Sequence, residues 1–190
     1  MKRGLYAITP ERFILDQVKR ALEGGIALLQ YRAKPPRRDE AAKLVELAAP
    51  YGVPVIVNDD LALAVEVGAA GAHLGREDPA PPAAKQGLLV GVSCYADLGR
   101  ARAAAAAGAD YIAFGSVFAS PTKPHAVRAP LALFREAKPL GVPLCAIGGI
   151  TLEHAPGIIE AGADLLAVIT DLFDAPDITA RARQYARLFR

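Results

Sequence analysis

The chain has 190 residues, of which 53% are hydrophobic and 22% charged, and its formal net charge is +2. This length suits one well-buried domain, and the nearly neutral charge argues against a protein that binds nucleic acid or a membrane surface. The first residues lack the apolar core of a signal peptide, and no apolar run approaches the ~20 residues that span a bilayer, so we expect a cytoplasmic protein. Cys94 and Cys145 are too few for a disulfide scaffold and lie in apolar stretches that do not indicate a zinc site.

A repeated pattern, in which a helix ends on glycine and a short apolar strand follows, occurs along the chain. It begins at Gly24, Gly68, Gly108 and Gly162, and glycine is the residue favoured where a helix ends in a left-handed turn. The spacing of about 40 to 55 residues leaves room for two strand–helix units between successive occurrences. The four repeats, each a helix end followed by one predicted strand, span 24–29, 68–74, 108–114 and 162–168. Four more predicted strands lie between them, at 5–8, 55–57, 89–92 and 144–147, which makes eight strands.

The segments between these strands have the apolar spacing of helices. Helices are predicted over 12–23, 39–49, 61–67 and 96–107, another begins with Thr151 as its N-cap, and the last carries an apolar stripe from Ile178 to Phe189. Strands that alternate with helices in this way are parallel and joined by right-handed crossovers. Eight units of about 24 residues predict an α/β fold, a (β/α)8 TIM barrel that forms a single compact domain over residues 1–190. A doubly wound open sheet is the alternative, and the regular repeat disfavours it.

Two acidic residues follow neighbouring predicted strands. Asp59 comes after the apolar run 55–57, and Asp78 comes shortly after 72–74. In a parallel sheet both would emerge at the same rim, where two carboxylates either share a proton or bind a cation. Oxygen ligands of this kind suit Mg²⁺ held together with a substrate phosphate. The alternative is that Asp60 caps the helix that follows and the other acids are solvated loop charges.

The second predicted strand runs into Gln30, Tyr31, Arg32, Ala33 and Lys34. Strand side chains alternate, so Gln30, Arg32 and Lys34 are expected to point in the same direction. An arginine can grip a phosphate through two hydrogen bonds and a lysine adds a point charge, which predicts an anion site. The alternative is a solvent-exposed basic loop.

The segment after the sixth predicted strand contains Ser120, Pro121, Thr122 and Lys123. Two hydroxyl groups beside a lysine, on a loop that proline stiffens, suit a phosphorylated ligand. An ordinary turn would use the same residue types.

The seventh and eighth predicted strands end at Gly148–Gly149 and at Ile169–Thr170. Loops in these positions of a barrel often bind phosphate, because glycine lets backbone N–H groups approach the anion. By contrast, His73 is predicted to be a packed core residue, His125 and His154 are predicted to lie at the surface, and Cys94 has no nearby base that would make it a nucleophile.

Taken together, these motifs resemble one enzyme family. They are Gln-Tyr-Arg-Ala-Lys at 30–34, Val-Asn-Asp at 57–59, His-Leu-Gly-Arg-Glu-Asp at 73–78, Gly-Val-Ser at 91–93, Gly-Ser-Val-Phe-Ala-Ser-Pro-Thr-Lys at 115–123 and Ala-Ile-Gly-Gly-Ile at 146–150. Their order and identity are similar to those of thiamine-phosphate synthases, also called thiamine-phosphate pyrophosphorylases. The resemblance covers almost the entire chain.

The resemblance implies that an aminopyrimidine diphosphate loses pyrophosphate and is attacked by the nitrogen of a thiazole phosphate. It implies Mg²⁺ as the cofactor, bound by Asp59 and Asp78, and small phosphorylated molecules as the partners. The residues implied for the pyrimidine diphosphate are Gln30, Arg32, Lys34, Asn58, Ser93 and Lys123, with Tyr31 and Ala33 in the same segment. Those implied for the thiazole phosphate are Ser120, Thr122, Gly149, Ile169 and Thr170, with the adjoining Pro121 and Gly148. Arg32, Ser93 and Lys123 are the candidate catalytic residues.

The chain departs from the family pattern at Ala33, where glutamate is usual, at Arg76, where glutamine is usual, and at Ser116, where proline is common. A related group, the thiazole tautomerases, is one alternative, but those proteins lack the pyrimidine-diphosphate residues, and a histidine at position 116 would have favoured it. A barrel that binds phosphorylated ligands without catalysis is another. The sequence leaves the oligomeric state open, with a homodimer as one alternative.

Overall fold

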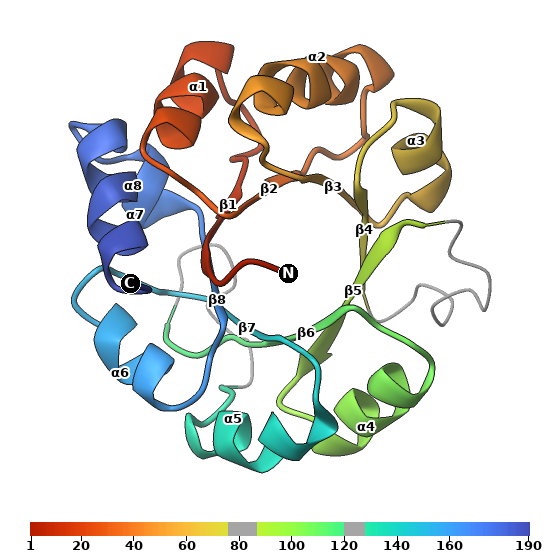
Figure 1. The fold of residues 1–190 in the computed structure, drawn as a ribbon, viewed down its shortest axis with the longest axis vertical. Helices are drawn as coiled ribbons and strands as arrows, with labels where there is room; N and C mark the ends of the chain where they lie inside the picture. Colours follow the sequence, from red (N-terminus) through yellow and green to blue (C-terminus); the bar gives the residue numbers. More distant parts are fainter. Residues whose placement is uncertain (76–86, 120–127) are drawn as a thin grey trace.

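The computed structural model describes residues 1–75, 87–119 and 128–190. Eight parallel strands pair in chain order and close into a barrel, in which β1 also pairs with β8 (Figure 1). The strands are β1 Gly4–Ile8, β2 Leu28–Tyr31, β3 Val55–Asn58, β4 Gly71–Leu74, β5 Leu89–Tyr95, β6 Tyr111–Phe114, β7 Leu144–Ile147 and β8 Leu165–Val168. The predicted (β/α)8 barrel is confirmed.

Helices surround the barrel on its outside (Figure 1). They are α1 Leu15–Glu23, α2 Arg38–Ala48, α3 Leu61–Glu66, α4 Leu98–Ala106, α5 Ala132–Ala137, α6 Ala155–Glu160, α7 Thr170–Phe173 and α8 Ile178–Arg187, with short 3-10 helices η1 Ala49–Tyr51 and η2 Lys138–Leu140. None of the helices in the described part of the chain has the length and apolar character needed to cross a bilayer.

One predicted helix start is wrong. Thr151 does not cap α6, which begins at Ala155. The Thr151 carbonyl instead accepts hydrogen bonds from the N–H groups of His154 and Ala155, both at 3.1 Å, and so closes a turn before the helix. A proline at the start of α6 fixes the helical φ angle there, which moves the start of the helix past that turn.

The strands divide the core into two layers. Side chains of opposite parity along each strand point into the barrel or out toward the helices. The inner set is Tyr6, Ile8, Leu28, Ile56, Tyr111, Ala113, Cys145, Leu165 and Ala167, and the outer set packs against the helices. This alternation assigns Gln30, Asn58 and Ser93 to the inner side, above the packed interior.

A glycine makes room for one of the two tyrosines inside the barrel. A Cβ atom at Gly91 of β5 would lie 2.0 Å from a ring atom of Tyr111. The absence of a side chain at Gly91 therefore lets the Tyr111 ring reach the middle of the barrel, where its hydroxyl oxygen lies 2.8 Å from that of Tyr6 on the distant strand β1.

The Gly-Ala-Asp sequence occurs at the start of both β6 and β8 and has the same structural role in each. Asp110 Oδ2 accepts a hydrogen bond of 2.7 Å from the Val90 N–H, and Asp164 Oδ2 accepts one of 3.1 Å from the Leu144 N–H. Each carboxylate thus fastens the amino end of its strand to an earlier strand.

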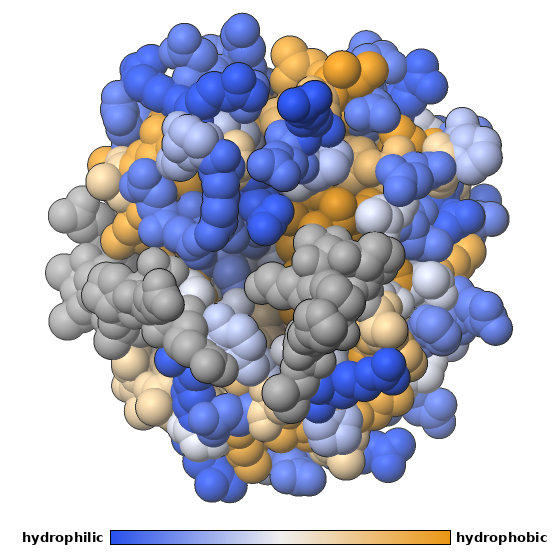
Figure 2. All heavy atoms as spheres, turned by 180° about the vertical axis from the view of Figure 1, so that it is seen from behind, coloured by the Kyte–Doolittle hydropathy of each residue, from blue (hydrophilic) through white to orange (hydrophobic). Residues whose placement is uncertain are grey.

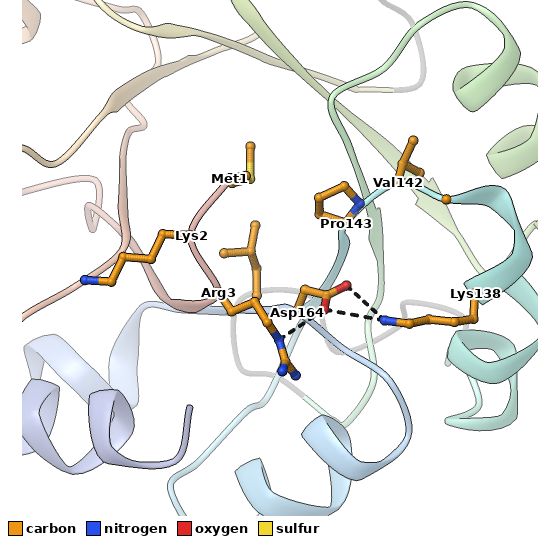
Figure 3. A pocket seen from close by; sticks show the side chains of 9 residues that line it. Met1, Lys2, Arg3, Lys138, Val142, Pro143 and Asp164 are labelled. Atoms are coloured by element: carbon orange, nitrogen blue, oxygen red, sulfur yellow. Dashed lines mark hydrogen bonds and ion pairs between the residues drawn. The ribbon is translucent and has the colours of Figure 1, made fainter. Parts of the chain in front are cut away.

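Asp164 also forms ion pairs with two basic side chains at this end of the barrel (Figure 3). It pairs with Arg3 at 3.1 Å and with Lys138 at 3.5 Å, beside a cavity of about 270 Å³. Since Asp164 stands before β8 and Arg3 before β1, this cavity lies at the amino ends of the strands, away from the predicted site.

Candidate active site

The carboxyl ends of the strands meet at the other face of the barrel, which we call the mouth. Gln30 belongs to β2, Asn58 ends β3, Ser93 belongs to β5, and the pairs Gly148–Gly149 and Ile169–Thr170 follow β7 and β8. Figure 2 looks onto this face and shows hydrophilic residues gathered beside a hollow near its centre. The structure therefore brings these predicted residues to one face.

Five of the predicted site residues lie outside the described residues. They are Asp78, Ser120, Pro121, Thr122 and Lys123, together with Arg76 and His125. The expectation that Asp59 and Asp78 hold one cation consequently stays a prediction. Among the described residues, no three His, Cys, Asp or Glu side chains lie close enough to bind a metal.

A chain of hydrogen bonds crosses the barrel interior and joins two of the predicted site residues. The Gln30 Nε2 group donates to Tyr6 Oη at 2.6 Å, and Tyr6 Oη lies 2.8 Å from Tyr111 Oη. Tyr111 Oη lies 3.0 Å from His73 Nδ1, and His73 Nε2 lies 2.9 Å from Ser93 Oγ. Gln30 and Ser93, which are far apart in the sequence, are thus connected at the floor of the mouth.

This chain also explains the environment of His73. The residue is only 8% exposed, which confirms its predicted place in the core, and its ring stacks on Tyr111 with centroids 5.5 Å apart. Burial raises the pKa of Tyr6 and of Tyr111 well above the ordinary tyrosine value, so both phenols stay protonated. The two tyrosines were not predicted as site residues, because in the sequence they look like ordinary core aromatic residues.

Thr9 holds the segment that follows β2. Its side chain is fully buried, and its Oγ1 accepts a hydrogen bond of 2.9 Å from the Arg32 N–H. The Thr9 N–H donates to the Gln30 carbonyl at 2.9 Å. This fixes the backbone of Arg32 next to the end of β1, although the sequence had given no reason to select Thr9.

Lys34 and Asp59 meet at the mouth. Lys34 Nζ lies 3.6 Å from Asp59 Oδ2, with side chains that are 67% and 39% exposed. Asp59 has a φ of 60°, which is uncommon for a residue other than glycine, and its N–H donates to the His73 carbonyl at 2.9 Å. The tip of β3 is thus held in a sparsely populated conformation that presents the carboxylate beside a predicted anion-binding lysine.

A cavity of about 300 Å³ lies beside this pair. Its lining includes Arg12, Lys34 and Arg37, together with Glu11, Ala33 and Pro35. Arg12 and Arg37 add positive charge that the sequence analysis had not assigned to the site. By contrast, Asp60 caps α3 through a hydrogen bond of 2.8 Å from the Leu63 N–H, as the alternative interpretation of that residue predicted.

Tyr31 points away from the mouth. Its hydroxyl accepts a hydrogen bond of 2.9 Å from the Arg37 N–H and donates to Glu40 at 3.0 Å, and its ring belongs to the outer core. Strand alternation separates it from Gln30 on the inner side, and Ala33 packs against the same outer core. The Tyr31 side chain therefore orders the loop after β2 and is not placed to contact a ligand in the mouth.

Gly148 and Gly149 allow the loop after β7 to pack beneath the loop after β6. Their φ values are 100° and 62°, and a Cβ atom would lie 2.0 Å from Ser116 Oγ in the first case and 2.2 Å from the Ala119 carbonyl oxygen in the second. The Phe118 N–H donates to the Gly148 carbonyl at 3.0 Å. Packing alone therefore requires glycine here.

Backbone donors remain at this point of the mouth. Within the described ranges, the N–H groups of Gly149 and Ile150 donate to no carbonyl, while the side chain of Ile169 packs against the inner core. An anion that approaches this loop would meet these N–H groups.

Arg100 was missed by the sequence analysis. From α4, its Nε donates to the Ser93 carbonyl at 2.8 Å and its Nη2 donates to the Gly75 carbonyl at 2.6 Å. It therefore joins the carboxyl ends of β4 and β5. A possible signal was its position three residues after Asp97, whose side chain caps α4 by accepting from the Arg100 N–H at 2.9 Å.

Cys94 is fully buried on the outer side of β5. Burial raises the pKa of its thiol to about 12, so the thiol is protonated at neutral pH. This agrees with the expectation that Cys94 is not a nucleophile.

The chain matches a known protein family over most of its length. A family model described as thiamine monophosphate synthase matches residues 5–172. The chain belongs to the thiamine monophosphate synthase family. The matched region runs from β1 to α7 and includes every predicted site residue, so the resemblance that the motifs indicated is confirmed.

Individual members of the thiamine monophosphate synthase family match over nearly their full length. The thiamine-phosphate synthase of Azoarcus sp. (strain BH72) is 54% identical over 200 residues, which cover 98% of this chain and 97% of that protein. That of Aromatoleum aromaticum is also 54% identical, with coverage of 98% and 96%. The solved structure of the thiamine phosphate pyrophosphorylase from Pyrococcus furiosus is 31% identical, with a TM-score of 0.85, and the alignment covers 98% of this chain and 95% of that one.

Proposed function

We propose that the protein is a thiamine-phosphate synthase, which joins an aminopyrimidine diphosphate to a thiazole phosphate and releases pyrophosphate. The observation that carries this conclusion is the match at 54% identity over 98% of the chain to an enzyme of that name. The geometry supports it, because Gln30, Ser93, Lys34 and Asp59 share the mouth of the barrel.

The mouth has the charges that this reaction needs. Pyrophosphate departs as an anion, so the enzyme must stabilise negative charge as the bond to the pyrimidine methylene carbon breaks. Lys34 and Arg32, in the segment that follows β2, are assigned to this task, and Lys123 is the predicted third cation. The electron-rich aminopyrimidine can carry the positive charge that develops, and the thiazole nitrogen then forms the new bond to carbon.

Gln30, Asn58 and Ser93 are assigned to the pyrimidine ring and its diphosphate. All three lie on the inner side of the barrel wall by strand alternation, and Gln30 and Ser93 belong to the buried hydrogen-bond chain. Their fixed side chains would orient the ring so that its methylene carbon faces the thiazole.

Asp59 and Asp78 are assigned to Mg²⁺. Asp59 fits this role because it is a hard oxygen donor at the mouth, partly exposed, and held in position by its hydrogen bond to the His73 carbonyl. The adjacent Lys34 would share the diphosphate with the ion. When bound, Mg²⁺ would supply positive charge to the departing pyrophosphate.

The loops after β7 and β8 are assigned to the thiazole phosphate. The Gly149 N–H is available to an anion, and Gly148, Ile169 and Thr170 flank it. Ser120, Pro121 and Thr122 are the predicted contributions from the loop after β6. The substrates would thus occupy opposite sides of the mouth, with the pyrimidine toward β2 to β5.

The test is a pyrophosphate-release assay with purified protein and Mg²⁺. Release should require both substrates, and thiamine phosphate should appear in equal amount. Isomerisation of the thiazole without release would identify a tautomerase instead, and ligand binding without either reaction would identify a regulator.

A further inference from the structure

The buried hydrogen-bond chain from Gln30 to Ser93 also restricts where its protons lie. Its members come from five strands, β2, β1, β6, β4 and β5 in order. Within the described ranges, no buried side-chain nitrogen or oxygen is without a hydrogen-bond partner. Every hydroxyl proton in the chain therefore has to be accounted for.

The proton order can be worked out from one end. The Gln30 N–H donates to Tyr6 Oη, so the single Tyr6 proton is directed to Tyr111 Oη. The Tyr111 proton then goes to His73 Nδ1, since a proton directed back to Tyr6 would leave the Tyr6 hydroxyl without an acceptor. A buried donor without an acceptor is costly.

The order also determines the state of His73. If Nδ1 accepts from Tyr111, the neutral ring carries its proton on Nε2 and donates it to Ser93 Oγ. A ring protonated on both nitrogens would donate from Nδ1, reverse the Tyr111 proton and create the same unpaired donor at Tyr6. The Ser93 hydroxyl proton is then left for a ligand in the mouth.

The other end of the chain is complementary. The Gln30 amide uses its nitrogen on Tyr6, and its oxygen has no hydrogen bond within the described residues. Gln30 is 2% exposed, so rotation of its side chain is restricted. The hydrogen bond from the amide nitrogen to Tyr6 therefore also fixes the direction of the amide oxygen. The floor of the mouth thus offers an acceptor at Gln30 and a donor at Ser93.

We propose that Tyr6, Tyr111 and His73 form a polarised chain of positioning residues, which makes Ser93 a hydrogen-bond donor and the Gln30 oxygen an acceptor, and so selects a ring with an acceptor nitrogen and a donor amino group. This rests on the proposed function. It predicts preference for an aminopyrimidine diphosphate over its oxo analogue, in which the amino donor is replaced by a carbonyl acceptor.

The first test reads the polarity without turnover. In protein labelled with ¹⁵N-histidine, the ring nitrogen shifts of His73 should show the neutral tautomer with the proton on Nε2. The other two histidines are identified with His125→Gln and His154→Gln. A proton on Nδ1, or on both nitrogens, would overturn the proposal whether or not the protein is a synthase.

Variants then locate the effect within the chain. Tyr111→Phe removes the donor to His73 Nδ1 and should yield a mixture of tautomers, with discrimination between the amino and oxo substrates lowered about tenfold. Tyr6→Phe breaks the chain one step earlier, leaves the Tyr111 hydroxyl donating to His73 Nδ1, and should retain the tautomer while it weakens pyrimidine binding. Equal effects of both variants on the tautomer would contradict the proton order.

The control is Tyr185→Phe. Tyr185 is also a buried tyrosine, and its hydroxyl donates to Asp171 at 2.7 Å between α8 and α7, outside the chain. This variant should lose stability but keep both the His73 tautomer and the substrate discrimination. If Tyr111→Phe only loses stability in the same way, Tyr111 has a purely structural role and the proposal is wrong.

Discussion

Lys34 Nζ lies 3.6 Å from Asp59 Oδ2, at the point where the loop after β2 meets the tip of β3. Both side chains are substantially exposed, and exposed ion pairs contribute only about 0 to 1 kcal/mol to stability. The pair is therefore of little use to the fold, which makes it suitable for separating effects on ligands from effects on stability.

Asp59→Asn should lower Mg²⁺-dependent pyrophosphate release on the order of 100-fold and change the free energy of unfolding by less than about 1 kcal/mol. Asparagine tolerates the positive φ of 60° that Asp59 adopts, so the backbone should not change. Steady-state kinetics and urea unfolding measure the two effects. Asp16→Asn, at an exposed acid on α1, is the control, and full activity in Asp59→Asn would remove this residue from the metal site.

The shared ion predicted for Asp59 and Asp78 can be tested by a double-mutant cycle. If both carboxylates bind one Mg²⁺, the loss in Asp59→Asn/Asp78→Asn should be much smaller than the product of the single losses, because residues that act as a unit are not additive. The activation constant for Mg²⁺ is measured for all four proteins. Strictly multiplicative effects would indicate two independent roles.

Arg100→Met should destabilise the protein by about 1 to 3 kcal/mol, because the carbonyls of Ser93 and Gly75 lose a charged donor in a partly buried position. The Michaelis constant for the pyrimidine substrate should also rise, since the backbone of Ser93 is released. Arg102→Met is the matched control, because Arg102 is exposed on the same helix. Equal unfolding midpoints for the two variants would show that the Arg100 contacts do not stabilise the mouth.

Gly149→Ala should destabilise the protein more than Gly52→Ala. Both glycines have a φ near 60° and would strain an alanine similarly, but a Cβ at Gly149 meets the Ala119 carbonyl oxygen at 2.2 Å, whereas one at Gly52 has nothing within 4 Å. We expect about 1 kcal/mol at Gly52 from φ alone and a larger loss at Gly149, seen in thermal unfolding. A similar loss at both positions would mean that the loops after β6 and β7 separate freely.

Burial of Cys94 predicts a loss of stability at alkaline pH. The unfolded thiol ionises near pH 9, whereas the folded thiol keeps its proton until about pH 12. Between these values the unfolded chain binds fewer protons, so the free energy of unfolding falls as pH rises. Cys94→Ala should reduce this slope in urea titrations at pH 9 to 11, and an unchanged slope would show that the thiol ionises equally in both states.

The fold was predictable because the repeat is regular. Apolar runs between glycine-terminated helices predicted all eight strands, and the bounds of β7 agree with the structure. The short helices α5 and α7 were not predicted, and the four residues of α7 are too few to show helical periodicity. The prediction of Thr151 as an N-cap was wrong because a threonine before an apolar stretch can close an isolated turn as well as cap a helix.

The candidate site was only partly predictable, for a geometrical reason. Charged residues after strands can be selected from the sequence, as Lys34 and Asp59 were. Tyr6 and Tyr111 are 105 residues apart, and only closure of the barrel brings their hydroxyls together. Long-range contacts of this kind have no local signature.

Gly91 shows how much depends on that closure. A methyl group at this position would occupy the space of the Tyr111 ring and push the phenol away from the barrel axis. The hydrogen bonds that join β2 to β5 through Tyr6, Tyr111 and His73 would then break. A ligand bound at β2 would no longer affect the side chain of Ser93 on β5. The absence of a side chain at Gly91 thus allows β2 and β5, which are distant in the sequence, to bind one ligand as a single surface.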